Sequence, residues 1–127
     1  MAQVLVVDDN PGLRLVARAM LEAAGHEVAE AGSGAEALDA LCGRRADVVL
    51  CDLSLPGMDG LQTIRELRAL QPGLKVVALS RVGLSESGVD VLGQARAAGA
   101  AETLCKPFDL AAVAAAVERA LRAPDVA

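Results

Sequence analysis

The segment VVLCDLSLPGMDG, residues 48–60, decides the fold of this chain. Its apolar run Val48–Cys51 predicts a short strand buried on both faces, because the run does not alternate with polar residues. Asp52 ends the run, and Pro56 with Gly57 predicts a turn shortly afterwards. The ends of the other strands decide whether this carboxylate belongs to a site.

Four more strands are expected, alternating with helices along the chain. They are predicted at residues 4–7, 26–31, 76–79 and 103–105, with one of the intervening helices over about 60–71. Short Val- and Leu-rich strands separated by helices indicate an α/β fold, in which a parallel sheet is covered on both faces. In an open sheet of this kind, ligands bind beyond the carboxyl ends of the strands.

Capping residues mark the starts of three helices. Asn10 before a proline predicts an N-cap, Ser33 with Glu36 predicts a capping box, and Asp109 caps the last helix. The first helix is expected to end at Gly25. The helix is predicted from its apolar residues at helical spacing, which are Leu13, Val16, Ala17, Met20 and Ala24.

Composition limits the class of protein. The 127 residues suit one domain, 1–127, and 54% hydrophobic residues indicate a packed core, although Phe108 is the only aromatic residue. The net charge of −5 and the absence of a basic stripe argue against direct nucleic-acid binding. No apolar run is long enough to span a membrane and no signal peptide is recognisable, so we expect a cytoplasmic protein.

The three cysteines and the single histidine are not expected to carry chemistry. An odd number of cysteines without a secretion signal argues against disulfides, and their spacing fits no zinc site. Cys42, Cys51 and Cys105 are therefore predicted to be small buried residues. His26 is predicted to lie on the surface.

Polar residues stand at the same end of four of the predicted strands: Asp8 and Asp9, Asp52, Ser80, and Lys106. Carboxylates packed together repel one another unless a cation intervenes. Oxygen ligands without histidine or cysteine favour Mg²⁺. A carboxylate can also attack phosphorus, and a metal ion with an ammonium group would neutralise the transferring phosphoryl group.

Four motifs in order carry a family resemblance that covers nearly the whole chain: VLVVDDNP, DLSLPGMDG, VVALS and CKPF. Together they resemble the receiver domain of bacterial two-component response regulators. The resemblance implies a flavodoxin-like doubly wound sheet of five parallel strands, in the order 2-1-3-4-5, with five helices.

The resemblance also implies a role for each acid. Asp52 is expected to be the phosphoacceptor. Asp9, Asp52 and the backbone carbonyl of Ser54 would hold Mg²⁺, and Asp8 would support the acidic pocket. Lys106 would contact the phosphoryl group.

Ser80 resembles the switch hydroxyl of the family, which would transmit phosphorylation to the rest of the fold. The implied partners are a histidine kinase or histidine phosphotransfer protein and a downstream effector, with a homodimer possible. Such a domain accepts phosphate and releases it from its own aspartate; it does not turn over external substrates. Release is predicted to be slow, because Ser54 and Val82 offer no obvious group to orient an attacking water.

Three departures bear on the expected conformational signal. Thr103 replaces the aromatic residue that usually stands three positions before the lysine, and Arg81 follows the switch position, where a small residue is usual. The segment from 81 to 100 is also longer than usual. We therefore expect signalling through rearrangement of residues 81–90.

Three alternatives remain open. Gly32, Gly34 and Ala37 match a dinucleotide-binding pattern, but they follow the second strand and leave Asp8 unused. An aspartyl phosphohydrolase like the haloacid dehalogenases would use similar chemistry, although the chain has no length for a cap domain. A receiver that no longer takes phosphate would act only as a binding module.

Overall fold

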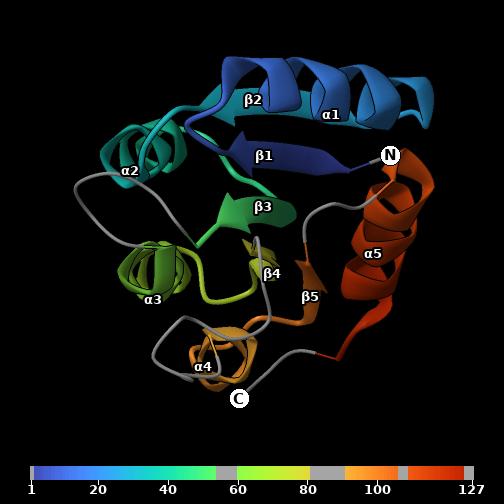
Figure 1. Cartoon of the computed structure of the whole chain (residues 1–127). Coiled ribbons are helices and arrows are strands. Elements are labelled where there is room, and N and C mark those ends of the chain that lie inside the picture. The colour runs from blue at the N-terminus through green and yellow to red at the C-terminus, as the bar shows by residue number, and fades with distance from the viewer. Residues whose placement is uncertain (1, 54–59, 81–90, 106–108, 125–127) are drawn as a thin grey trace.

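The computed structural model describes residues 2–53, 60–80, 91–105 and 109–124. Within them, five parallel strands form one sheet in the order β2-β1-β3-β4-β5, which confirms the predicted topology (Figure 1). The strands are β1 (Gln3–Val7), β2 (Glu27–Ala31), β3 (Val48–Asp52), β4 (Lys75–Ser80) and β5 (Glu102–Cys105). The helices are α1 (Pro11–Ala23), α2 (Gly34–Cys42), α3 (Gly60–Leu70), α4 (Val91–Ala97) and α5 (Leu110–Arg122).

Helices cover both faces of the sheet, with α1 and α5 on one face and α2, α3 and α4 on the other (Figure 1). Successive strand residues point to opposite faces. Leu5 and Val7 accordingly lie in the core under α2 and α3, whereas Val4 and Val6 lie in the core under α1 and α5. This two-sided burial explains why the central strands read as continuous apolar runs.

The predicted caps are confirmed, and they fix where three helices begin. The Asn10 side chain accepts hydrogen bonds from the backbone N–H groups of Gly12 and Leu13. The Ser33 hydroxyl accepts from the Glu36 N–H, and the Asp109 carboxylate accepts from an N–H in the first turn of α5. Each cap satisfies donors that the helix itself leaves without a partner.

The apolar residues of α1 that recur at helical spacing are only partly buried. Ala17 and Leu21 are the buried residues of this helix, whereas Val16 is 45% exposed and Ala24 lies beyond its last turn. Residues four apart share one row of a helix, so α1 buries a narrow row that contains Ala17 and Leu21. Gly25 ends the segment as predicted, with a positive φ of 96° that suits glycine at this position.

His26 and Cys42 also differ from the prediction. His26 is buried: its Nδ1 accepts a hydrogen bond of 3.1 Å from the Ala2 N–H, and its Nε2 lies 3.3 Å from Oε1 of Glu118 on α5. Cys42 is exposed, because Leu41 occupies the buried row at the end of α2. Cys51 is buried as predicted, and the Cys105 side chain lies outside the described residues.

Of the helices that the structure describes, none is long and apolar enough to cross a membrane.

Candidate functional site

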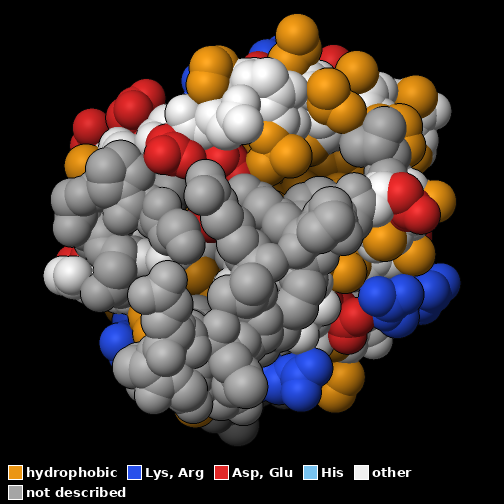
Figure 2. Space-filling view, in the orientation of Figure 1, with side chains coloured by type: hydrophobic (Ala, Val, Ile, Leu, Met, Phe, Trp, Pro, Cys, Tyr) orange, Lys and Arg blue, Asp and Glu red, His pale blue; other side chains and the backbone are white. Residues whose placement is uncertain are grey.

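Three carboxylates converge where the two central strands end. Val7 pairs with Cys51 in the register of β1 and β3, so Asp8 follows one strand while Asp52 ends its neighbour. Asp8, Asp9 and Asp52 each offer an oxygen atom, and these atoms lie within 4.8 Å of one another. Figure 2 looks onto this end of the molecule and shows Asp and Glu side chains gathered toward its upper left, over the start of α1 and over α2.

The three acids differ in exposure. Asp8 is fully buried and Asp52 is 3% exposed, whereas Asp9 is exposed. Oδ1 of Asp8 accepts a 2.9 Å hydrogen bond from the Asn10 N–H, which ties this carboxylate to the start of α1. The site therefore has two acids held in the protein interior and a third at its mouth.

This donor set fits a divalent cation of the Mg²⁺ type. All three donors are hard carboxylate oxygens, which suit Mg²⁺ better than metals that prefer nitrogen or sulfur. Three like charges at this separation repel one another, and a bound cation would relieve the repulsion. Asp8, Asp9 and Asp52 are thus the described residues that could hold it.

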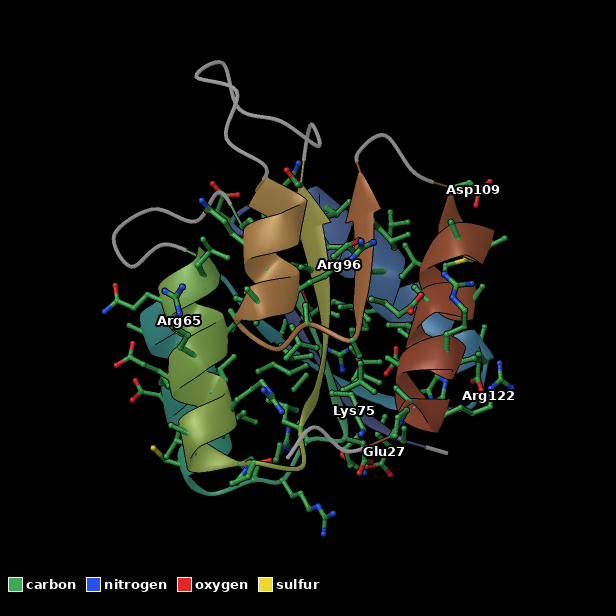
Figure 3. The ribbon with its side chains drawn as sticks, turned by 90° about the horizontal axis from the view of Figure 1, so that it is seen from below. Glu27, Arg65, Lys75, Arg96, Asp109 and Arg122 are labelled. Carbon is green, nitrogen blue, oxygen red and sulfur yellow. The ribbon has the colours of Figure 1, made fainter. Side chains whose placement is uncertain are left out.

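Ser80 lies beside this cluster at the end of β4. Asp52 pairs with Leu79 in the register of β3 and β4, so Ser80 stands one residue beyond that pair and is 5% exposed. The predicted site residues Ser54 and Lys106 lie outside the described residues. The other lysine of the chain, Lys75, begins β4 and lies at the opposite end of the sheet (Figure 3).

Gly60, at the start of α3, packs closely against Leu53, the residue that follows Asp52. A Cβ atom at Gly60 would overlap the Cα of Leu53 and lie 2.6 Å from the carbonyl oxygen of Asp52. The Gly60 N–H also donates a 3.3 Å hydrogen bond to the Leu53 carbonyl, and the Leu53 N–H donates one of 2.9 Å to the Leu79 carbonyl. Glycine is needed here for this close approach. Sequence reasoning placed the helix start at Gly60 but missed its contact with the site.

The Cys51 thiol is buried directly behind the cluster. Burial raises its pKa strongly, and the nearby carboxylates of Asp52 and Asp8 raise it further. Because the reactive form of cysteine is the thiolate, Cys51 stays protonated and unreactive at neutral pH. The protonated Cys51 thiol is therefore excluded as a nucleophile, and the carboxylates of the cluster remain candidates.

Arg14 is a residue near the site that sequence reasoning missed. Its Nη1 donates a 2.6 Å hydrogen bond to the backbone carbonyl of Asp8, and its Nε lies 3.2 Å from Oε1 of Glu30. Arg14 occupies the first turn of α1, whereas Glu30 belongs to the edge strand β2. No local pattern in the sequence joins these two positions to Asp8.

Thr103, one of the departures from the receiver pattern that the sequence resembles, contacts α4. Nη2 of Arg96 donates a 3.0 Å hydrogen bond to the Thr103 hydroxyl, and Figure 3 shows Arg96 extending between α4 and β5. On the other face of the sheet, Nε of Arg119 on α5 lies 2.6 Å from Oε1 of Glu102 on β5. Polar contacts thus join β5 to the helices on both sides of it.

Comparisons with known proteins agree with this geometry. The family model described as "Response regulator receiver domain" matches residues 4–118. The chain is 29% identical over 119 residues to sporulation initiation phosphotransferase F of Bacillus subtilis, covering 94% of this chain and 93% of that protein. It is 36% identical over 118 residues to the transcriptional regulatory protein ZraR of Escherichia coli, covering 93% of this chain.

The coverage of these relatives differs. The chain spans 26% of the length of ZraR, so it corresponds to one part of that longer protein. Among solved structures, the chemotaxis protein CheY4 of Vibrio cholerae superposes with a TM-score of 0.84 at 30% identity, covering 94% of this chain and 98% of that one.

Proposed function

Because this chain belongs to the response regulator receiver domain family, we propose that it accepts a phosphoryl group on Asp52 and that Mg²⁺ is required for the transfer. The observation that supports this proposal most is the convergence of the Asp8, Asp9 and Asp52 carboxylates, whose oxygens lie within 4.8 Å of one another. The receiver domain would extend over residues 1–127.

The proposed reaction is a phosphoryl transfer between side chains. A carboxylate oxygen of Asp52 attacks the phosphorus of a phosphohistidine, a P–O bond forms as the P–N bond breaks, and the histidine of the donor leaves with the bonding electron pair. Bound Mg²⁺ would neutralise charge on the transferring group. Asp8 and Asp9 would hold the ion together with Asp52 and the Ser54 carbonyl, and Lys106 would contact the phosphoryl oxygens.

Receiver domains are regulatory signalling modules of two-component systems, and they do not turn over external substrates. The donor for this chain would be a histidine kinase or a histidine phosphotransfer protein, and an effector protein or domain would respond. A second copy of the receiver is a further proposed partner. We propose that the aspartyl phosphate is lost slowly, with a lifetime well above seconds, since Ser54 and Val82 offer no carboxylate or amide group to orient an attacking water. A cytoplasmic location stays a prediction.

The proposed signal begins at Ser80, whose hydroxyl would be drawn toward the phosphoryl oxygens. Thr103 cannot supply the ring rotation of the usual aromatic residue, so we propose that residues 81–90 rearrange instead. That segment lies outside the described residues. Chemical-shift changes on phosphorylation that spare residues 81–90 would contradict this part of the proposal.

Intact-mass spectrometry tests the proposed function. The protein is incubated with acetyl phosphate and Mg²⁺, and the same reaction is run with Asp52→Asn and with EDTA. We expect one phosphoryl adduct per chain, labile in alkali, which both the substitution and the chelator abolish. A wild-type chain that stays unmodified would favour the binding-module alternative, and an adduct that persists in Asp52→Asn would refute the assignment of Asp52.

A further inference from the structure

The exposed acid of the cluster, Asp9, depends on the backbone for its position. Its neighbour Asp8 is fixed at its N–H, which donates a 3.1 Å hydrogen bond to the Ala31 carbonyl, and at its carboxylate, which accepts from the Asn10 N–H. The carbonyl of Asp8 belongs to the planar peptide that leads into Asp9. A group that fixes this carbonyl oxygen therefore also fixes the orientation of the peptide bond between Asp8 and Asp9.

Arg14 holds that carbonyl. Nη1 of its guanidinium group donates to the backbone carbonyl oxygen of Asp8 at 2.6 Å, and Nε donates to Oε1 of Glu30 at 3.2 Å. Two acceptors thus fix the orientation of the planar guanidinium group. The Arg14 side chain is only 20% exposed. A charged donor to a carbonyl gives a stronger hydrogen bond than a neutral donor.

The surroundings keep Arg14 in this orientation. Glu30 lies on β2, which runs beside α1 (Figure 1), and its second oxygen accepts a 3.1 Å hydrogen bond from Nη1 of Arg18. Gly32, in the turn after β2, lies beside the guanidinium, where a Cβ atom would make an ordinary contact of 3.4 Å with Nη1 of Arg14. The arginine is thus supported mainly by the edge strand.

We propose that Arg14 is a positioning residue for the metal site: by holding the Asp8 carbonyl against α1 and β2, it orients the peptide that presents Asp9 to the cation. Arg14 does not contact the metal or the phosphoryl group in this role. The inference rests on the proposed Mg²⁺-dependent function of the site.

The sign of the effect separates this role from simple electrostatics. Removing a positive charge beside an acidic cluster strengthens the attraction of the cluster for a cation. A loss of cation affinity in Arg14→Ala would therefore come from misplaced ligands, because the change in charge alone acts in the opposite direction. Loss of a residue that supports a metal ligand typically weakens metal binding by about 10-fold or more.

Arg18 provides the matched control. It lies one turn further along α1, carries the same charge and shares Glu30 as a partner, yet no hydrogen bond described for it reaches Asp8. Arg18→Ala removes the same charge and two ion pairs, one with Glu30 and one with Glu22. We expect it to leave the dissociation constant for Mg²⁺ within about twofold of the wild type, because such exposed pairs contribute little and the ligands stay in place.

The experiment is a calorimetric titration of the full chain with MgCl₂, together with amide NMR spectra of Asp9 and unfolding free energies from urea. We expect Arg14→Ala to weaken Mg²⁺ binding about 10-fold and to shift the Asp9 amide signal. Arg14→Lys should recover part of the affinity, since one ammonium can still donate to the carbonyl. Because the titration is run where each variant is folded, a change in stability alone does not alter the dissociation constant.

Each outcome is decisive. If Arg14→Ala binds Mg²⁺ as tightly as the wild type or more tightly, or if Arg18→Ala weakens binding equally, the positioning role is refuted. If Arg14→Ala does not fold, the comparison of Arg14→Lys with Arg18→Ala is used: weaker binding in Arg14→Lys alone supports the role, and equal binding refutes it. A wild-type chain that binds no Mg²⁺ refutes the proposed function itself, which is a distinguishable failure.

Discussion

Gly60 and Leu53 pack backbone against backbone, so closely that a Cβ atom at Gly60 would overlap the Cα of Leu53. The contact joins the start of α3 to the residue that follows Asp52, and it therefore fixes the backbone of Leu53 directly after β3.

Gly60→Ala is expected to destabilise the protein by about 1–3 kcal/mol, because backbone atoms must move to admit the added methyl group. It should also slow phosphorylation by acetyl phosphate at saturating Mg²⁺, since the peptide next to Asp52 shifts. Urea denaturation followed by far-ultraviolet circular dichroism measures the first effect, and intact-mass time courses measure the second. Gly43→Ala is the control, because a Cβ atom there meets nothing within 4 Å; equal losses in both variants would contradict the prediction.

Asp52→Asn is expected to stabilise the metal-free protein by about 1 kcal/mol, because it removes one of three carboxylates that repel one another. The measurement is the unfolding free energy in EDTA. Added Mg²⁺ should raise the stability of the wild type, in proportion to its binding, and should raise that of the variant much less. A variant that is less stable than the wild type in EDTA would show that repulsion does not dominate the cluster.

The buried Cys51 thiol predicts a loss of stability at alkaline pH. Burial raises the pKa of this thiol in the folded protein, whereas in the unfolded chain a cysteine ionises near pH 8.5. Unfolding then releases a proton above that pH, so stability is complete below about pH 8 and falls as the pH rises. By pH 10 the loss should reach about 1–2 kcal/mol.

Urea denaturation between pH 7 and 10, in EDTA, tests this dependence. Cys51→Ala should lose less stability across the range than the wild type, whatever its stability at pH 7. Cys42→Ala should follow the wild-type slope, because the Cys42 thiol is already exposed in the folded state. Parallel slopes for all three proteins would rule out the effect.

The contact of His26 with Ala2 predicts a structural role for the histidine. His26→Leu should cost about 1–3 kcal/mol, because the buried N–H of Ala2 loses its acceptor. Glu118→Gln should change stability by less than about 0.5 kcal/mol, since Glu118 is half exposed and glutamine still offers an acceptor. Similar losses in the two variants would place the effect in the contact with α5 instead.

The parts of the fold that follow from local pattern could be predicted from the sequence. The strand at Val48 and the caps at Asn10 and Ser33 were recognisable because burial on both sides and orphan helix donors leave signatures in neighbouring residues. The meeting of Asp8 with Asp52 followed from one rule about parallel sheets, together with a family resemblance.

The remaining features depend on contacts between distant segments. His26 is buried because α5 and the start of β1 pack around it, and nothing near it in the sequence shows this. The hydrogen bond from Arg14 to the Asp8 carbonyl likewise depends on Glu30 of β2, which accepts a second hydrogen bond from the same guanidinium group. Exposure of Cys42 was missed because a one-residue step around a helix moves a side chain from the core to solvent.

The three acids come from two separate segments of the polypeptide, two from the connection between β1 and α1 and one from the central strand β3. A fragment ending before residue 48 would carry two of them and its complement the third, so neither alone would have the set. Cation binding would thus require that β1 and β3 are already paired, so the ion would bind the folded chain and not its separate parts, and ion binding would add to the free energy of unfolding.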